Sequence, residues 1–282
     1  MRMQVANFRD AYFRLNHHLF MQNEYDYVRT GVTAHKFHVQ LEIDSAECDL
    51  DMHIMNYTPR KWEMLCNLYL EPQELGIMIA RLLHYRDKKR NLIYIPDIGM
   101  NFKTRRNVSG SCLMAITVGY NQVQGWHCEV FSRASELTLR WYVDLIFIHV
   151  LLREIGKFVG FTPKDVKVYW TMASTYQSIT SMPWFLVLEN EEAFLQRPLD
   201  SFEYNSWAWH TVRRYHKCYL NTGYTSYKVQ NRPVDAYRMY KGEKPYKTVI
   251  PTSELTLLKG VDLSELITWA QENDTFGKGG YR

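Results

Sequence analysis

The chain has few cysteines, and their spacing gives no sign of pairing. Its 282 residues contain five, an odd number with no Cys-x-x-Cys motif, which argues against a disulfide framework and against a structural zinc site. They are Cys48, Cys66, Cys112, Cys128 and Cys218. We therefore expect a reducing, cytoplasmic location and no bound metal.

Long apolar runs and long runs of like charge are also missing. No window approaches the roughly 20 uninterrupted apolar residues of a membrane span, and residues 1–20 lack the apolar core of a signal peptide. The formal net charge of +4 is spread along the chain, so no extended surface for a polyanion is required. We expect no membrane partner and no stable nucleic-acid partner.

The residues that are abundant indicate a globular protein. Apolar residues make up 46% of the chain and aromatic residues 15%, enough to build a substantial core without disulfides. We find no internal repeat and no low-complexity linker, which favours a single domain over residues 1–282. From about residue 183 the sequence becomes rich in tryptophan and tyrosine, and we treat that part as divergent.

Apolar spacing and turn residues predict both helices and strands. Helices are expected over residues 4–22, 60–70, 72–90 and 136–160, with one or two short helices in 253–273. Strands are expected over residues 37–43, 91–99, 111–120 and 126–133, and after a turn within 161–174. Residues 121–125 form the expected turn of a hairpin, and Ser264 is the expected N-cap of the last helix.

Chemically distinctive residues follow one another in a recognisable order over residues 128–176. Arg133 ends a predicted strand, Asp144 lies inside the apolar helix that follows, and Tyr176 follows the next strand. This pattern, with a Thr-Pro-Lys-Asp turn at 162–165, resembles the core of the thymidylate synthase and pyrimidine hydroxymethylase family. The resemblance implies an α+β protein with the thymidylate synthase fold, a mixed β-sheet on which a central buried helix packs. It also implies a homodimer, a pyrimidine nucleoside monophosphate as substrate and 5,10-methylenetetrahydrofolate as cofactor.

The resemblance assigns roles to four residues. Cys112, which lies 21 residues before Arg133, takes the place of the nucleophile, and Arg133 that of the phosphate-binding arginine. Asp144 falls on the position that reads the base, and Tyr176 on the tyrosine that hydrogen-bonds the sugar hydroxyl. Taken singly, Cys112 is an ordinary strand cysteine and Asp144 an ordinary acid on the polar face of a helix.

Further cations resemble the phosphate-binding groups of the family. Arg29 opens an Arg-Thr-Gly turn like the family's phosphate loop, and Lys89 with Arg90 resembles the arginine pair that reaches the partner subunit's phosphate. Arg105 and Arg106 form a competing pair, which we rank second.

Other positions concern the water step or depart from the family. Glu63 is our candidate for the base that activates water, with Glu71 and Glu74 as rivals, and Glu136 is expected to order the site. Ser174 stands where the family has histidine and is counted among the substrate-binding residues. Two further departures are Ala134 in place of serine, and Ser111 and Leu113 in place of the proline and histidine around the nucleophile.

The family's chemistry explains why Cys112 and Asp144 are the informative residues. A thiolate adds to C6 of the pyrimidine so that C5 becomes nucleophilic, and a nearby cation such as Arg133 is expected to lower the pKa of the Cys112 thiol. Family members that act on uracil have asparagine at the base-reading position. A carboxylate only accepts hydrogen bonds, which suits the amino group of cytosine.

The sequence therefore predicts hydroxymethylation of dCMP, and the resemblance implies a bacteriophage origin, with the host cytoplasm as location. An alternative is methylation of dUMP or dCMP, as in thymidylate synthases, or hydroxymethylation of dUMP. An alternative of another class is a catalytically silent relative that binds nucleotides or single-stranded nucleic acid through basic loops and aromatic residues.

Overall fold

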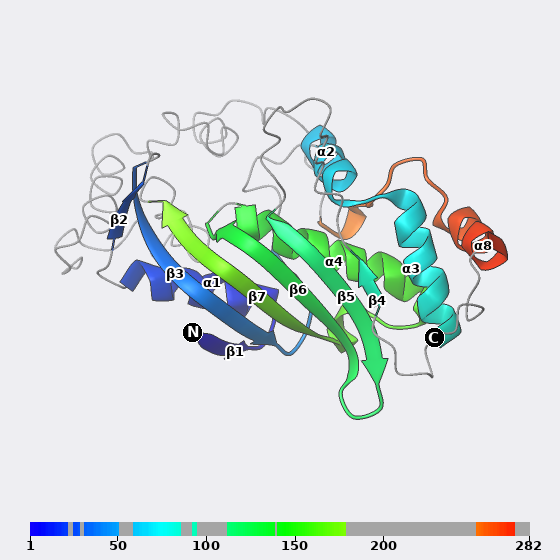
Figure 1. The fold of residues 1–282 in the computed structure, drawn as a ribbon, viewed down its shortest axis with the longest axis horizontal. Coiled ribbons are helices and arrows are strands. Elements are labelled where there is room, and N and C mark those ends of the chain that lie inside the picture. Colours follow the sequence, from blue (N-terminus) through cyan, green and yellow to red (C-terminus); the bar gives the residue numbers. More distant parts are fainter. Residues whose placement is uncertain are drawn as a thin grey trace, which may run out of the picture.

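A computed structural model describes residues 1–21, 25–28, 31–50, 59–85, 92–94, 112–138, 140–178 and 252–273, and all that follows concerns these ranges (Figure 1). The strands are β1 (Arg2–Val5), β2 (Tyr25–Val28), β3 (Gly31–Ile43), β4 (Leu92–Tyr94), β5 (Leu113–Asn121), β6 (Gly125–Glu136) and β7 (Val166–Ser178). The α-helices are α1 (Phe8–Met21), α2 (Pro59–Tyr69), α3 (Pro72–Tyr85), α4 (Arg140–Val159) and α8 (Leu263–Asn273). Short 3₁₀ turns cover Pro163–Asp165 and Thr252–Glu254.

The seven strands form one mixed sheet in the order β1-β3-β7-β6-β5-β4, with β2 paired to β3. β1 runs parallel to β3 and β6 parallel to β7, whereas β3–β7, β5–β6, β4–β5 and β2–β3 are antiparallel. Since β6 and β7 are parallel, they need a crossover, which α4 provides. The expected α+β class with a mixed sheet is thus confirmed.

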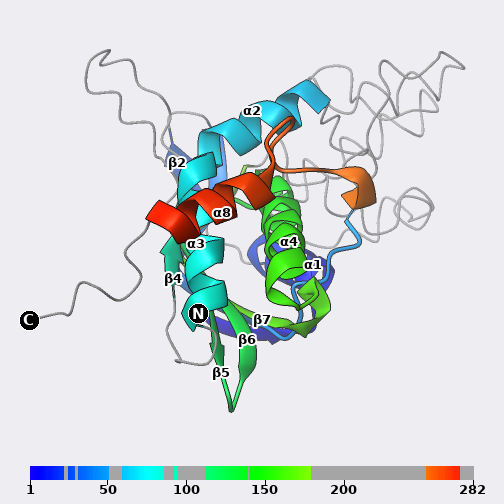
Figure 2. The same cartoon turned by 90° about the vertical axis from the view of Figure 1, so that its right-hand side faces the viewer.

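Helices α1 and α4 lie against the same face of the sheet (Figure 1). α4 is buried nearly all round, as its apolar sequence requires: 15 of its 20 residues are buried, Trp141 and Phe147 among them. Helices α2, α3 and α8 pack beside it at the β4 end (Figure 2). The other face of the sheet carries no helix among the described residues, and side chains such as Phe131 are exposed there.

The regular strand register is interrupted in a row across four strands, β3, β7, β6 and β5. It skips the pairs His38–Ala173 and Arg133–Ala173, and it shifts by one residue on β5 next to Leu113. His38 has a φ of 53°, in the left-handed region. On β7 every second residue is buried up to Met172, but the next buried residue is Thr175, three positions later. The interruption therefore changes which side chains at this end of the sheet point to the buried face.

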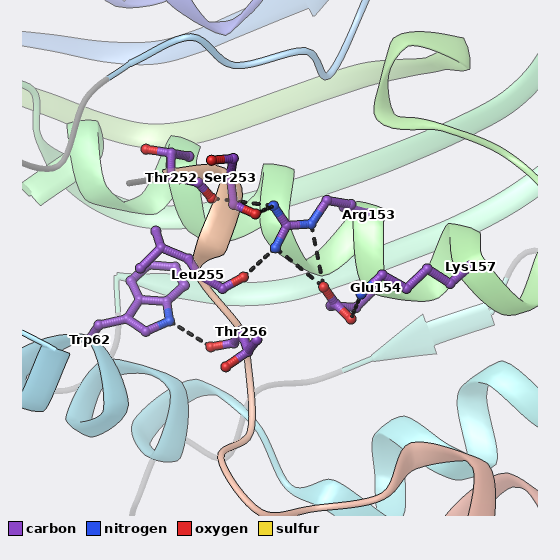
Figure 3. Close-up of polar contacts among 8 residues, drawn as sticks. All are labelled: Trp62, Arg153, Glu154, Lys157, Thr252, Ser253, Leu255 and Thr256. Atoms are coloured by element: carbon purple, nitrogen blue, oxygen red, sulfur yellow. Dashed lines mark hydrogen bonds and ion pairs between the residues drawn. The ribbon is translucent and has the colours of Figure 1, made fainter. Parts of the chain in front are cut away.

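The last described segment is fastened to α4 by Arg153 (Figure 3). Its guanidinium donates to the backbone carbonyls of Thr252 (3.2 Å), Ser253 (3.0 Å) and Leu255. The Thr252 hydroxyl also donates to the carbonyl of Leu50, 2.9 Å away. A single arginine thus binds three backbone carbonyls of this segment, of which that of Thr252 also accepts from the Leu255 N–H.

The same segment contacts α2 and α3. Trp62 Nε1 donates to the carbonyl of Thr256 over 2.7 Å (Figure 3). α8 crosses α3 at Gly76, where a Cβ atom would lie 2.8 Å from Cβ of Leu266, so a larger residue would push the two helices apart. Residues 252–273 therefore join α2, α3 and α4.

The structure corrects several predicted boundaries. Residues 2–5 form β1 rather than the start of the first helix, because Asn7 caps α1: Asn7 Oδ1 accepts from the Asp10 N–H, and Asp10 Oδ2 from the Ala6 N–H. α4 begins at Arg140 and not at 136, which still belongs to β6.

One further strand boundary differs: the strand expected at 37–43 starts at Gly31. Of the strand expected at 91–99, residues 92–94 form β4, and the others lie outside the described residues. The N-cap of α8 is Asp262, whose Oδ1 accepts from the backbone N–H of Ser264, so Ser264 is not the cap. The hairpin turn at 121–125 is confirmed: Asn121 Oδ1 accepts from the N–H groups of Val123 and Gln124.

Candidate functional site

Three strands bring Cys112, Arg133 and Tyr176 to one end of the sheet. Cys112 immediately precedes β5, and its carbonyl accepts from the backbone N–H of Arg133 on β6, 2.9 Å away. On the neighbouring parallel strand Tyr176 lies opposite Glu136, and its carbonyl accepts from the N–H of Leu137 at 3.0 Å. The end of β6 and the start of β5 meet because those strands are antiparallel.

The same end of the sheet holds the beginning of α4. Glu136 is buried, and its two carboxylate oxygens accept from the backbone N–H groups of Thr138 (3.3 Å) and Arg140 (3.2 Å). A carboxylate is favourable there because the N-terminus of a helix carries partial positive charge. Glu136 therefore fixes where α4 starts.

Asp144 lies in the second turn of α4 and is only 3% exposed. The Tyr69 hydroxyl donates to its Oδ1 at 2.9 Å, whereas Oδ2 has no hydrogen-bond partner within the described part of the chain. Burial raises the pKa of this carboxyl to about 7, against the lowering effects of the Tyr69 hydrogen bond and of Arg140. A buried carboxyl with one unsatisfied oxygen is destabilising, which makes it a candidate for binding a ligand. The reading of Asp144 as a surface acid is wrong.

Cys112 is partly buried beside this carboxyl. Burial and the charge of Asp144 raise the pKa of the thiol, whereas the Arg140 and Arg133 guanidinium groups and a hydrogen bond from Arg140 lower it. The raising effects are the larger, so the pKa lies above the ordinary value. The expected lowering by Arg133 is therefore present but outweighed.

The remaining assigned residues of this region surround the same end of the sheet. The Arg133 side chain is exposed, and the Ser174 hydroxyl donates to the Arg133 carbonyl over 3.4 Å. The Tyr176 ring meets the His35 ring edge-on, with centroids 5.7 Å apart. Burial raises the pKa of Tyr176, and Glu136 and Cys112 act in the same direction, which places Tyr176 close to both.

Two residues of this site were missed by sequence reasoning. Arg140 acts on the pKa values of Cys112, Asp144 and Tyr176, so it lies among them, but in the sequence it looks like any helix-surface cation. Tyr69 shares the buried face of α2 with Trp62, a spacing that predicts burial but not its partner on α4.

Other predicted residues lie elsewhere. Glu63 is exposed on α2, and its charge acts on Cys66. In the described ranges no hydrogen bond or ion pair joins Glu63 to the four assigned residues near α4. Glu71 and Glu74 are exposed at the start of α3. None of these three acids is among the charges that act on the pKa of the Cys112 thiol in the described structure.

Several predictions fall outside the described residues. They concern Arg29, Lys89 and Arg90, the competing pair Arg105 and Arg106, and the aromatic residues from 183 to 251. In the part of the chain that is described, no group of three or more His, Cys, Asp or Glu residues could hold a metal ion. None of the described helices has both the length and the apolar character needed to cross a membrane.

No protein-family model and no curated protein matches the chain. Its candidate function therefore depends on the geometry above and on the resemblance of residues 128–176.

Proposed function

We propose that the protein transfers a hydroxymethyl group to C5 of a pyrimidine nucleotide, converting dCMP, methylenetetrahydrofolate and water to 5-hydroxymethyl-dCMP and tetrahydrofolate. The observation that carries the proposal is the position of Asp144: a buried carboxyl with an unsatisfied oxygen lies beside Cys112. Arg133 and Tyr176, which the resemblance assigns to the same substrate, come to the same end of the sheet.

In this proposal Cys112 adds its sulfur to C6 of the base, and the negative charge that reaches C5 makes that carbon a nucleophile. The thiol must first lose its proton. Arg140, which donates a hydrogen bond to Cys112, is the group best placed to stabilise the thiolate. Asp144 opposes ionisation of the thiol while it carries its own negative charge, and a hydrogen-bond donor of the substrate would offset that charge.

Asp144 would select the base and Arg133 would hold the phosphate. Oδ2 of an ionised Asp144 can accept from the amino group of cytosine, whereas an asparagine amide could also donate to the carbonyl of uracil. The exposed Arg133 guanidinium offers forked donors suited to a phosphate.

The cofactor would supply the one-carbon unit. No contact of the described residues singles out a folate site, so methylenetetrahydrofolate stays a prediction of the resemblance. The same holds for Glu63 as the base that activates water.

The raised pKa of the Cys112 thiol favours a second candidate function. A relative that binds pyrimidine nucleotides without reacting would need Asp144 and Arg133 but no thiolate. In such a protein the partly buried cysteine would only fill space beside the base.

Product analysis by mass spectrometry separates these functions. The protein is incubated with methylenetetrahydrofolate and with dCMP, CMP or dUMP in turn. A hydroxymethyl gain on dCMP is the expected result. A methyl gain, or turnover of dUMP alone, would retain cysteine catalysis and overturn the specificity argument for Asp144. Binding without any product would support the second candidate.

We also propose that the protein is a homodimer that uses the open face of the sheet. That face exposes Phe131 (40%) in a depression of about 340 Å³, where Arg2 and Glu42 supply charges of both signs. A self-complementary contact of two copies suits such a mixed face. Light scattering should give twice the monomer mass, and Phe131→Glu should return the monomer mass; a wild-type monomer would contradict the proposal.

A further inference from the structure

A hydroxyl group outside the family resemblance touches the candidate base-reading residue. Tyr69 is the last residue of α2 and precedes Asp144 by 75 positions, yet its hydroxyl lies 2.9 Å from Asp144 Oδ1. Its ring packs edge-on against Phe147, one helical turn after Asp144, with centroids 5.0 Å apart. Tyr69 therefore contacts α4 through both its ring and its hydroxyl.

The position of Tyr69 is set by packing at the other end of α2. The Trp62 ring also meets Phe147, with centroids 6.3 Å apart, and its Nε1 donates to the Thr256 carbonyl. Residue 256 belongs to the segment that Arg153 fastens to α4 (Figure 3). α2 is thus held to α4 both directly and through this segment, so the hydroxyl of Tyr69 has little freedom to move.

This contact makes the two oxygens of Asp144 unequal. Oδ1 accepts from Tyr69, and Oδ2 has no partner among the described residues although it is buried. The charged and titratable groups that face the carboxyl come from three elements: Tyr69 on α2, Cys112 before β5 and Arg140 on α4. Because Tyr69 holds Oδ1, Oδ2 is the oxygen left to accept from a ligand.

We propose that Tyr69 is a positioning residue for base recognition: it orients the Asp144 carboxyl so that Oδ2 alone receives one N–H donor of the bound base. The inference rests on the proposed function and adds to it the reason for selectivity. An oriented acceptor oxygen matches the exocyclic amino group of cytosine and faces a carbonyl oxygen in uracil, which it repels. Without Tyr69 the carboxyl can rotate, and this discrimination weakens.

The test compares wild-type protein, Tyr69→Phe and the matched control Tyr120→Phe. Both changes remove one hydroxyl, but Tyr120 lies at the far end of β5, against Trp126. Titration calorimetry measures binding of dCMP and of dUMP to each protein, and circular dichroism checks that each is folded. We expect Tyr69→Phe to reduce the preference for dCMP roughly tenfold and Tyr120→Phe to leave it unchanged.

A second readout needs no nucleotide. The Asp144 carboxyl is followed by ¹³C NMR against pH, with Asp144→Asn identifying its signal. Since the Tyr69 hydrogen bond favours the ionised form, Tyr69→Phe should raise the pKa of Asp144 further above its value in wild type.

The outcomes separate this inference from the proposed function. A wild-type preference for dCMP that survives Tyr69→Phe, or an unchanged Asp144 titration in that variant, would overturn the role of Tyr69 alone. If wild-type protein binds neither nucleotide, the proposed function is overturned, and base recognition through Tyr69 with it.

Discussion

Two buried acids on α4 differ in how they are satisfied. Glu154, in the C-terminal half, is 8% exposed; its Oε1 accepts from Arg153 and its Oε2 from Lys157. Asp144, in the N-terminal half, has a single hydrogen bond from Tyr69 and one oxygen without a partner in the described structure. Glu154 stabilises the end of α4 to which Arg153 attaches the C-terminal segment, whereas the burial of Asp144 lowers the stability of the protein. Glu154 thus has the contacts of a structural acid, and the proposed ligand binding falls at the other end of α4, on Asp144.

The largest expected effect is on base preference. Asp144→Asn should lower kcat/KM for dCMP by about 10³-fold and favour dUMP, because the amide donates where the carboxylate only accepted. The matched control Glu154→Gln should stay within about threefold of wild type. Steady-state assays with both nucleotides check this, and an unchanged preference in Asp144→Asn would contradict base recognition by Asp144.

The second effect is on stability against pH. The folded pKa of Asp144, about 7, lies above its ordinary 3.8, so the folded state keeps a proton that the unfolded chain releases. The contribution of Asp144 to wild-type stability should be full below about pH 4, fall as pH rises toward 7 and stay low above it. The loss is on the order of 4 kcal/mol at most. Asp144→Asn should remove this dependence and be the more stable protein at pH 8 in urea titrations; the opposite order would contradict the argument.

The third effect concerns the satisfied acid. Glu154→Gln leaves Arg153 and Lys157 without their anion, so the free energy of unfolding should fall by about 2 kcal/mol. The urea titrations at pH 8 that test Asp144→Asn measure this as well. If Glu154→Gln stabilised the protein, the two acids would not differ in the way described.

The smallest effect concerns the thiol. Arg140→Leu removes a charge and a hydrogen bond that lower the pKa of Cys112, so alkylation by iodoacetamide at pH 8 should slow by roughly three- to tenfold. The control Arg60→Leu, at the exposed start of α2, should react like wild type. An equal rate in both variants would remove Arg140 from the site.

The sequence allowed much of the sheet and of α4 to be predicted, but for different reasons. Apolar spacing predicts α4, and the Asn121 turn predicts the β5–β6 hairpin, since both signals are local. β1 could not be predicted because its four residues become a strand only by pairing with β3. Long-range pairing of this kind leaves no local signal.

The candidate site was predictable only through the family resemblance. The spacing of residues 112–176 alone does not indicate that the charge of Asp144 acts on Cys112, whereas the order of the motifs places both in one site. Tyr69 and Arg140 could not be found, because each depends on how α4 sits against other elements. The raised pKa of the Cys112 thiol was also missed, since burial is a property of the fold.

The most direct test of the central claim is release of tritium from C5 of [5-³H]dCMP in the presence of methylenetetrahydrofolate. Wild-type protein should release tritium, because addition of Cys112 to C6 labilises the hydrogen at C5. Cys112→Ser should release it at least about 10³-fold more slowly, and Cys48→Ser, which alters a buried cysteine outside the site, at the wild-type rate. Equal release by Cys112→Ser and wild type would contradict cysteine catalysis, and no release by either would leave a protein that binds nucleotides without reacting.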